Sequence, residues 1–348
     1  MRTRTLLTLL TITLIAALVK ISNSRKHADS AILASDLLSQ PGPTFVIPDS
    51  RLNHPPTVIT YGDTRFTNPA DTADTDPNVR QWLVKRIAEE RPDALLINGD
   101  LPLAGERKND YAVFERETRS WRDAHLCIFP ALGNHELHGN AQRCLENWWD
   151  TFPKLRNRRW YSAQLGSRVF IVVLDSTSSL TSQSEQFRWL QQQLASIPSS
   201  IDFVLITLHH PPVADVQLHM EVSHNPRMNE IAVRDLLSNI AGRIHARILV
   251  SAGHIHNYER QVRSEVVYLV SGGGGARPYP VERTAADLYR SDTFPNYHYV
   301  KLTLESDRMH GSMMRLSNPE SQLPVFVEGD SFDLNVKPVP IPKPQSFF

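Results

Sequence analysis

The sequence has only two cysteines among its 348 residues, Cys127 and Cys144. Two are too few for a disulfide scaffold, and their spacing matches no zinc or redox motif. In an exported protein such a pair predicts one disulfide. Two buried free thiols are the equally weighted alternative, because Cys127 falls inside the strand-like segment 126–129.

The chain also lacks a net charge, since 37 basic residues balance 37 acidic ones. This balance gives no argument for a nucleic-acid partner or an anionic membrane surface. A hydrophobic content of 41% with 21% charged residues is typical of a globular protein. The length allows one large α/β domain or two ordinary domains, and no internal repeat is visible.

No apolar run reaches the length of about 20 residues that a membrane span needs. The longest N-terminal run is Leu6–Val19, preceded by Arg2 and Arg4 and closed by Lys20. This pattern predicts a secretory signal within residues 1–24, and hence export to the periplasm or the extracellular space. The segment 22–24 is a poor cleavage site, so an uncleaved anchor that leaves the protein membrane-attached and facing outward stays open.

The remaining chain is predicted to form a linker or arm (25–56), a main domain (57–317) and a Pro-rich C-terminal tail (318–348). In the main domain, apolar segments alternate with amphipathic ones, which predicts an α/β fold with a largely parallel sheet. Later strands without long helices between them predict an antiparallel portion. The expected strands are 58–61, 94–97, 126–129, 168–174, 203–208, 248–250, 266–270, 299–304 and 309–316, and the helices lie at about 76–90, 110–123, 187–194 and 228–241.

Two histidines follow the strand 248–250, in the segment Gly253-His254-Ile255-His256. Residues two apart in an extended chain point to the same side, with backbones roughly 6.6 Å apart. They can therefore serve one metal ion, or one each of two adjacent ions. Taken alone, the pair fits an ordinary polar loop equally well.

Five predicted strands end in side chains that bind metals. The carboxyl ends of parallel strands are where ligands gather in such sheets. Carboxylate, amide and imidazole groups without a thiolate suit iron, manganese, zinc or cobalt. One open catalytic ion usually needs about three protein ligands, so the larger number here predicts two ions. The candidate residues are Asp63, Asp100, Asn134 with His135, His209, and His254 with His256.

The order of these motifs resembles that of the calcineurin-like metallophosphoesterases, over about residues 58–316. The resemblance implies a two-sheet mixed β-sandwich flanked by helices, in four αββα layers. Two further segments are similar to the purple acid phosphatase branch. The motifs are Gly62-Asp63, Gly99-Asp100, Gly133-Asn134-His135-Glu136, His209-His210-Pro211 and Gly253-His254-Ile255-His256, and the branch segments are His256-Asn257-Tyr258-Glu259-Arg260 and Ser271–Ala276.

The resemblance also implies a role for each residue. Asp63 and His256 would bind one metal ion, and Asn134, His209 and His254 the other, with Asp100 as the bridge. The implied activity is hydrolysis of phosphoric monoesters or diesters, with a metal-bound hydroxide as nucleophile. His135 would act as general acid or electrostatic clamp for the leaving alkoxide.

The chain departs from the family pattern at two positions. Leu103 stands where the purple branch has a tyrosine ligand, so no purple ferric–tyrosinate site is expected. Arg65 stands where the wider superfamily often has a histidine, and a guanidinium cannot ligate because it stays protonated. Arg65 is then either a structural salt bridge, which we favour, or a contact for the substrate phosphate.

Several histidines and acids carry two interpretations each. His210 is either a substrate contact or a loop residue, and Glu136 either orients His135 or begins a helix. His219 and His224 are expected at the surface, and Asp175 in a turn.

Two other functions stay open: hydrolysis of lipid-linked or nucleotide pyrophosphates near a membrane, and a non-catalytic binding or scaffold role. Neither the substrate nor the oligomeric state follows from the sequence.

Overall fold

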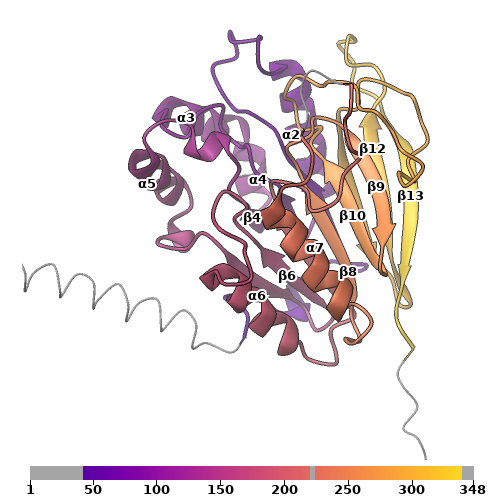
Figure 1. Cartoon of the computed structure of the whole chain (residues 1–348). Helices are drawn as coiled ribbons and strands as arrows, with labels where there is room; N and C mark the ends of the chain where they lie inside the picture. Colours follow the sequence, from indigo (N-terminus) through magenta and orange to yellow (C-terminus); the bar gives the residue numbers. More distant parts are fainter. Residues whose placement is uncertain (1–41, 220–223, 339–348) are drawn as a thin grey trace, which may run out of the picture. The chain divides into compact units, whose positions relative to one another are not determined.

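The computed structural model describes residues 42–219 and 224–338 (Figure 1). The predicted signal or anchor at 1–24 lies outside the described residues, as do most of the expected linker and the end of the tail. Within the described ranges, no helix is long and apolar enough to cross a membrane. The larger of two compact units, Pro43–Leu190 with Ile197–Phe348, contains both sheets and every candidate site residue; Gln191–Ser196 at the end of one helix belongs to the other.

This larger unit holds two mixed sheets, which we call sheet A and sheet B. Sheet A has the order β1-β5-β6-β7-β8-β10-β9, and sheet B the order β13-β12-β11-β2-β3-β4. Figure 1 shows β8, β10 and β9 side by side in sheet A. Sheet A comprises β1 Phe45–Ile47, β5 Tyr161–Leu165, β6 Val169–Val173, β7 Phe203–Leu208, β8 Arg247–Ala252, β9 Tyr258–Arg263 and β10 Val266–Ser271, and sheet B comprises β2 Thr57–Tyr61, β3 Ala94–Ile97, β4 Ile128–Pro130, β11 His298–Leu304, β12 Arg308–Leu316 and β13 Phe326–Asn335.

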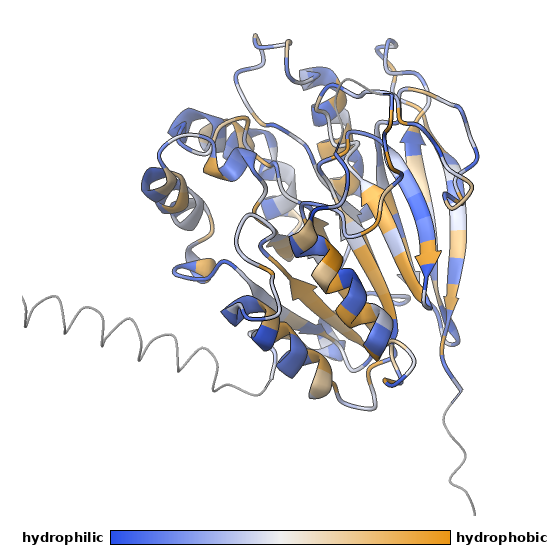
Figure 2. Cartoon of the chain, in the orientation of Figure 1, coloured by the Kyte–Doolittle hydropathy of each residue, from blue (hydrophilic) through white to orange (hydrophobic). Residues whose placement is uncertain are grey.

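The core lies between the two sheets. Every residue of β6 is buried, and Ile171 and Val173 join one apolar cluster with Ile59 of β2 and Leu95 of β3. Because side chains alternate along a strand, the intervening β6 residues face the other side of sheet A, which helices must cover. Figure 2 shows this contrast between apolar central strands and helices with mixed faces.

Helices connect the parallel strands and flank the sheets, which confirms the predicted fold class. α2 Pro77–Glu90 begins where the sequence predicts, capped by Asp76, whose Oδ1 accepts from the N–H groups of Asn78 and Val79. It packs on sheet B, where Glu90 binds Lys301 at 2.7 Å. The other helices are α3 Lys108–Glu117, α4 Arg119–Asp123, α5 Ala141–Thr151, α6 Glu185–Ala195 and α7 Met228–Ile240, with short 3₁₀ turns η1 Asp49–Arg51, η2 His135–Leu137 and η3 Pro153–Leu155.

One predicted helix is two. The segment 110–123 was expected as a continuous helix, but the chain breaks at Thr118 between α3 and α4. The Thr118 hydroxyl donates to the carbonyl of Phe114 at 2.6 Å, a local bond that competes with regular helix.

The hydrogen-bonded fold extends past both ends of the predicted main domain, 57–317. β1 lies in the expected linker and pairs with β5, and β13 lies in the expected tail and pairs with β12. β1 is too short and β13 too polar to show an apolar pattern. Both cysteines are free, with Cys144 buried and Cys127 half-buried, so the structure has the free-thiol alternative rather than the disulfide.

Candidate metal centre

The structure brings the six predicted ligands together at the carboxyl ends of both sheets. Sheet B supplies three of them from the loops after β2, β3 and β4, and sheet A supplies three from the loops after β7 and β8. Ligand atoms of Asp63, Asp100 and His209 all lie within 4.8 Å of one another. The full set is Asp63, Asp100, Asn134, His209, His254 and His256.

Three donor atoms surround a fourth, the Nε2 atom of His209. The Nε2 atom of His209 lies 2.9 Å from Asn134 Oδ1, 3.1 Å from His254 Nδ1 and 3.3 Å from Asp100 Oδ1. Ligands of one tetrahedral ion, with bonds of about 2.0–2.2 Å, are separated by roughly 3.3 Å. The chemistry of these donors, and their distances to His209 Nε2, fit ligands of a shared metal ion. We call this set the four-donor cluster.

A second set adjoins the first through Asp100. His256 Nε2 lies 3.5 Å from Asp63 Oδ1, and both Asp63 oxygens accept from the His254 N–H, at 2.9 and 3.2 Å. Asp100 Oδ2 is buried and has no hydrogen-bond partner. A carboxylate with one oxygen in the four-donor cluster and the other unsatisfied fits a bridging position between two cations.

Three imidazole rings are oriented by backbone carbonyls. Nδ1 of His209 pairs with Asn98 O at 2.9 Å, Nδ1 of His256 with Arg277 O at 2.7 Å, and Nδ1 of His135 with Leu103 O. A neutral ring that donates from Nδ1 presents Nε2 as a lone pair. For His209 and His256 this places the free nitrogen toward the other candidate ligands.

Asn98 ties the two sheets together directly beneath the centre. Its Oδ1 accepts from Thr60 of β2 at 2.9 Å and from Thr207 of β7 at 2.7 Å, and its Nδ2 donates to Ser251 of β8 at 3.0 Å. This residue was not predicted from the sequence. Its place immediately before Gly99-Asp100, at the end of an apolar strand, was the available signal.

The backbone at the centre is left-handed at four non-glycine residues, Asp63, Arg65, Asp100 and His254, with φ of 60°, 46°, 54° and 71°. Such conformations cost on the order of 1–3 kcal/mol each and persist where the surroundings hold them. Close packing adds a further constraint, because a Cβ at Gly133 would lie 2.4 Å from Asp100 Oδ1.

Glu136 holds the loops of the centre in place. Its buried carboxylate accepts from the backbone N–H groups of Asp100 (2.9 Å), Leu101 (2.7 Å) and Gly133 (2.7 Å). It lies in the short 3₁₀ turn η2, in line with the expected helix start, and the His135 ring pairs with the Leu103 carbonyl. Burial and the nearby Asp100 charge raise the pKa of Glu136 to about 8.

The pKa of Asp100 is lowered, in contrast to that of Glu136. Burial raises its pKa, but His209, His135 and Arg65 outweigh this effect and hold the pKa at about 2. A carboxylate kept ionised in a buried site is suited to binding cations.

His135 lies beside the ligands rather than among them. The backbone N–H of His135 donates to Asp100 Oδ1 at 3.0 Å, and the ring Nε2 of His135 lies 3.8 Å from Asp100 Oδ2. Burial lowers the pKa of the ring.

The remaining predicted residues divide into those near the centre and those away from it. His210 is buried, pairs with Ser176 at 2.9 Å, and groups with His209 and His254 as a possible ligand set. His224 was expected at the surface, but it is half-buried and its ring lies 4.2 Å from that of His254.

His219 is exposed, as expected, and pairs with Glu282 at 2.9 Å. Asp175 accepts from the N–H of Thr177 at 2.8 Å, in the turn that the sequence predicts.

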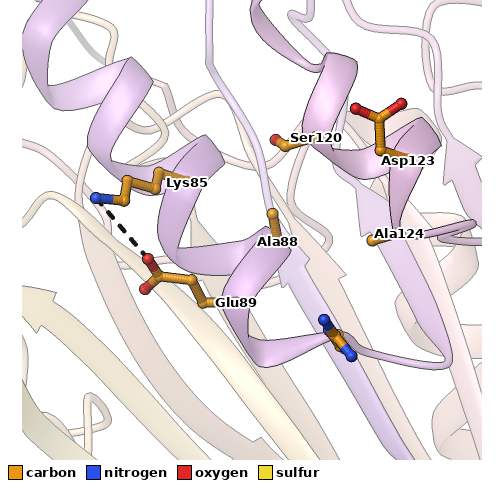
Figure 3. A pocket seen from close by; sticks show the side chains of 7 residues that line it. Lys85, Ala88, Glu89, Ser120, Asp123 and Ala124 are labelled. Carbon is orange, nitrogen blue, oxygen red and sulfur yellow. Dashed lines mark ion pairs between the residues drawn. The ribbon is translucent and has the colours of Figure 1, made fainter.

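A surface hollow lies elsewhere, between α2 and α4 (Figure 3). None of the candidate site residues lines it, and its ion pair, Lys85 with Glu89, lies within one exposed helix face. The lining residues are Lys85, Ala88, Glu89, Arg91, Ser120, Asp123 and Ala124.

The fold is that of a metallophosphoesterase. The sequence profile of the calcineurin-like phosphoesterases matches residues 62–258, more than half of the chain, and the protein belongs to this family. A probable glycerophosphodiester phosphodiesterase of Arcobacter nitrofigilis is 26% identical over 240 residues, which are 66% of this chain and 81% of that protein. A phosphoenolpyruvate phosphatase of Allium cepa is 29% identical over 170 residues, 45% of this chain and 33% of that protein.

Solved structures share the fold. A purple acid phosphatase from yellow lupin seeds superposes with a TM-score of 0.64 at 18% identity, covering 81% of this chain and 54% of that chain. A dimetal phosphatase from Danio rerio superposes with a TM-score of 0.55 at 14% identity, covering 85% and 100%. The chain thus spans only a third to about half of the plant phosphatases it matches.

Glu259, three residues beyond His256, is buried with an unusual charge environment. Its Oε2 accepts from the Asp215 N–H at 2.7 Å, while its Oε1 and the Oδ2 of Asp215 have no hydrogen-bond partner. Burial and the Asp215 charge raise the pKa of Glu259 well above its usual value. Protonation of Glu259 adds a hydrogen-bond donor to a buried region in which Glu259 Oε1 and Asp215 Oδ2 have no donor.

This shift predicts a pH effect on stability. The protonated Glu259 side chain stabilises the fold fully at a pH below its pKa in the unfolded chain. This stabilisation is lost as the pH rises toward its pKa in the folded protein, so the free energy of unfolding falls with rising pH. Glu259→Gln, which cannot ionise, should gain stability relative to the wild type as the pH increases. Urea unfolding of both metal-free proteins from about pH 5 to about pH 9 measures the difference. Parallel pH profiles would contradict the shift.

Proposed function

We propose that the protein is a metal-dependent hydrolase of phosphoric esters with a two-cation centre. The observation that carries the proposal is the convergence of Asn134, His254 and Asp100 on the Nε2 atom of His209. Asp63 and His256 would hold the second cation, with Asp100 between the two. Iron, manganese, zinc and cobalt all suit these oxygen and nitrogen ligands.

Bound cations would supply a water nucleophile of lowered pKa and positive charge for the phosphate oxygens. The chain's own residues do the rest. Asp100, kept ionised, offsets the positive charge at the centre. His135, beside Asp100 and 15% exposed, would give a proton to the departing alkoxide from its doubly protonated ring, the form that the Asp100 charge favours. Arg65 and His210 line the same centre and are the proposed contacts for the phosphate.

The class of ester is part of the proposal. The bacterial relative is named as a probable diesterase and the plant relatives as phosphatases, so both diesters and monoesters are candidate substrates. Export of the protein, predicted from residues 1–24, would place this activity in the periplasm or outside the cell. Pyrophosphates near a membrane and a non-catalytic scaffold role are the competing functions.

Metal analysis with parallel hydrolysis assays separates these functions. The purified protein should contain bound metal and should hydrolyse an aryl phosphate monoester, an aryl diester or both. Chelation should abolish hydrolysis, and manganese, zinc or cobalt should restore it. Full activity without bound metal would contradict the mechanism. Bound metal with no hydrolysis of either ester or of a pyrophosphate would favour a scaffold.

Replacement of His135 by alanine tests the proton donor. The kcat for an alkyl phosphate ester is expected to fall by about 10²–10⁴-fold, the usual contribution of a general acid. The loss should be much smaller for a nitrophenyl ester, whose leaving group needs no proton. An equal loss for both esters would show that His135 acts in another way.

A further inference from the structure

A fixed positive charge lies inside the candidate metal centre. Arg65 is two residues beyond Asp63, and its Nη2 atom lies 3.7 Å from Asp100 Oδ2. The side chain is 16% exposed, and a guanidinium remains protonated even when it is buried. Any cation bound through Asp100 Oδ2 would therefore have this charge as a neighbour.

The backbone holds Arg65 in this position. Its N–H donates to the Asp100 carbonyl at 3.0 Å, and its own carbonyl accepts from Arg80 at 3.3 Å. Arg80 is itself buried and paired with Glu117 at 2.9 Å. With φ at 46°, Arg65 is fixed on both sides of its Cα, which restricts how far the guanidinium can move from the centre.

Arg65 and Asp100 form an ion pair at 3.7 Å without a direct hydrogen bond. Charged hydrogen bonds of this type are about 2.7–2.9 Å long, and this pair is further apart. The Nε of Arg65 and the Oδ2 of Asp100 are both buried, and neither has a hydrogen-bond partner. The guanidinium thus contributes positive charge to the centre, while the Arg65 Nε donor and the Asp100 Oδ2 acceptor stay available for other partners. The pairing with a carboxylate is the one that the sequence favours, but the ion pair leaves donors of the guanidinium available.

The two donor sets feel this charge unequally. The four-donor cluster uses Asp100 Oδ1, which lies 3.3 Å from His209 Nε2. The second set needs Asp100 Oδ2, the oxygen that Arg65 approaches, and otherwise has Asp63 and His256 alone. Like charges at such distances repel strongly in a site with little water. The second cation is therefore disfavoured both by missing ligands and by repulsion.

We propose that Arg65 supplies one of the two positive charges of this centre. The protein then binds a single metal ion tightly, at Asn134, His209, His254 and Asp100, and a second ion at Asp63 and His256 only weakly. This inference rests on the proposed function and refines its two-cation centre. The guanidinium and one ion together would face the phosphate.

Metal titration of four proteins tests the proposal: wild type, Arg65→His, Arg65→Lys and Arg65→Gln. Each is stripped with a chelator, titrated with Mn²⁺ by calorimetry, and analysed for metal after gel filtration. The wild type and Arg65→Lys, which keep the charge, should retain one tight ion per chain. Arg65→His adds a ligand and removes the charge, so it should retain two. The second affinity should rise by about 10–100-fold, the range for changes next to metal ligands.

Electron paramagnetic resonance gives a readout that does not depend on activity. Mn²⁺ in the wild type should give the spectrum of isolated ions, and in Arg65→His that of an exchange-coupled pair. If Arg65→His fails to fold, Arg65→Gln still tests the charge, since it should bind the second ion more tightly than Arg65→Lys does. Arg143→His, an exposed arginine paired with Glu106, is the control for the substitution itself.

The outcomes separate the two proposals. Two equally tight ions in the wild type, unchanged in Arg65→His, would overturn the role of Arg65 and leave the metal-dependent function intact. No bound ion in any of the four proteins would overturn the proposed function itself.

Discussion

Replacing Asp100 by asparagine is expected to lower kcat/KM by about 10³-fold, the upper range for removing one preorganised electrostatic group. The asparagine side chain keeps the shape and the acceptor for the His135 N–H but loses the charge that lies between the two donor sets. The same variant should retain far less metal after gel filtration, because a neutral amide replaces the anion whose pKa is held at about 2.

Measuring bound metal distinguishes a role of Asp100 in the metal centre from a general effect of the substitution. Asp123→Asn, at an exposed acid outside the centre, is the matched control and should behave as the wild type. A variant at Asp100 that binds metal normally and loses no activity would remove Asp100 from the centre. Loss of activity together with a lowered melting temperature would instead indicate a folding defect, so thermal melting accompanies both assays.

Replacing Glu136 by alanine is expected to damage both stability and activity. Three buried backbone N–H groups lose their acceptor, and each unsatisfied donor costs about 1–3 kcal/mol. The free energy of unfolding should fall by at least about 3 kcal/mol. At roughly 2 °C for each kcal/mol, this lowers Tm by at least about 6 °C. Activity should fall as well, because the loops that position Asp100 and Asn134 lose their common support.

Glu136→Gln should have a smaller effect on stability than Glu136→Ala. The amide oxygen can keep the two bonds that Oε2 accepts, from Asp100 and Gly133, while the bond from Leu101 is lost. The loss of stability should therefore be smaller than for alanine. Glu146→Ala, on an exposed face of α5, controls for removing a glutamate. Equal stability of all three variants would mean that the three bonds contribute little, as when water replaces the carboxylate.

The fold could be predicted from the sequence where strands carry continuous apolar runs. The predicted bounds of β3 and β7 agree with the structure, and each strand is fully buried. β9 and β13 were missed because polar residues interrupt them, so their positions depend on pairing with β10 and β12. Edge strands of this kind are set by tertiary contacts that no local pattern contains.

The candidate site was predictable as a set of strand ends, but its supports were not. The sequence placed Asp63, Asp100 and His209 near one another, and the structure brings them together. Their chemical roles remain predictions. Asn98 and Glu136 act through hydrogen bonds to residues distant in the sequence or to backbone groups, which leave no periodic signal. His224 was misplaced because nothing in its own segment indicates the ring of His254 beside it.

The left-handed backbone at the strand ends has a consequence for engineering. Glycine relieves the strain of positive φ, and aspartate or asparagine tolerates it better than most residues. Asp63, Asp100 and His254 thus place candidate metal ligands at positions where glycine would relieve backbone strain. Stability and the candidate metal centre therefore make opposite demands on the backbone at these positions, so selection for heat resistance alone would act against the side chains that the centre needs.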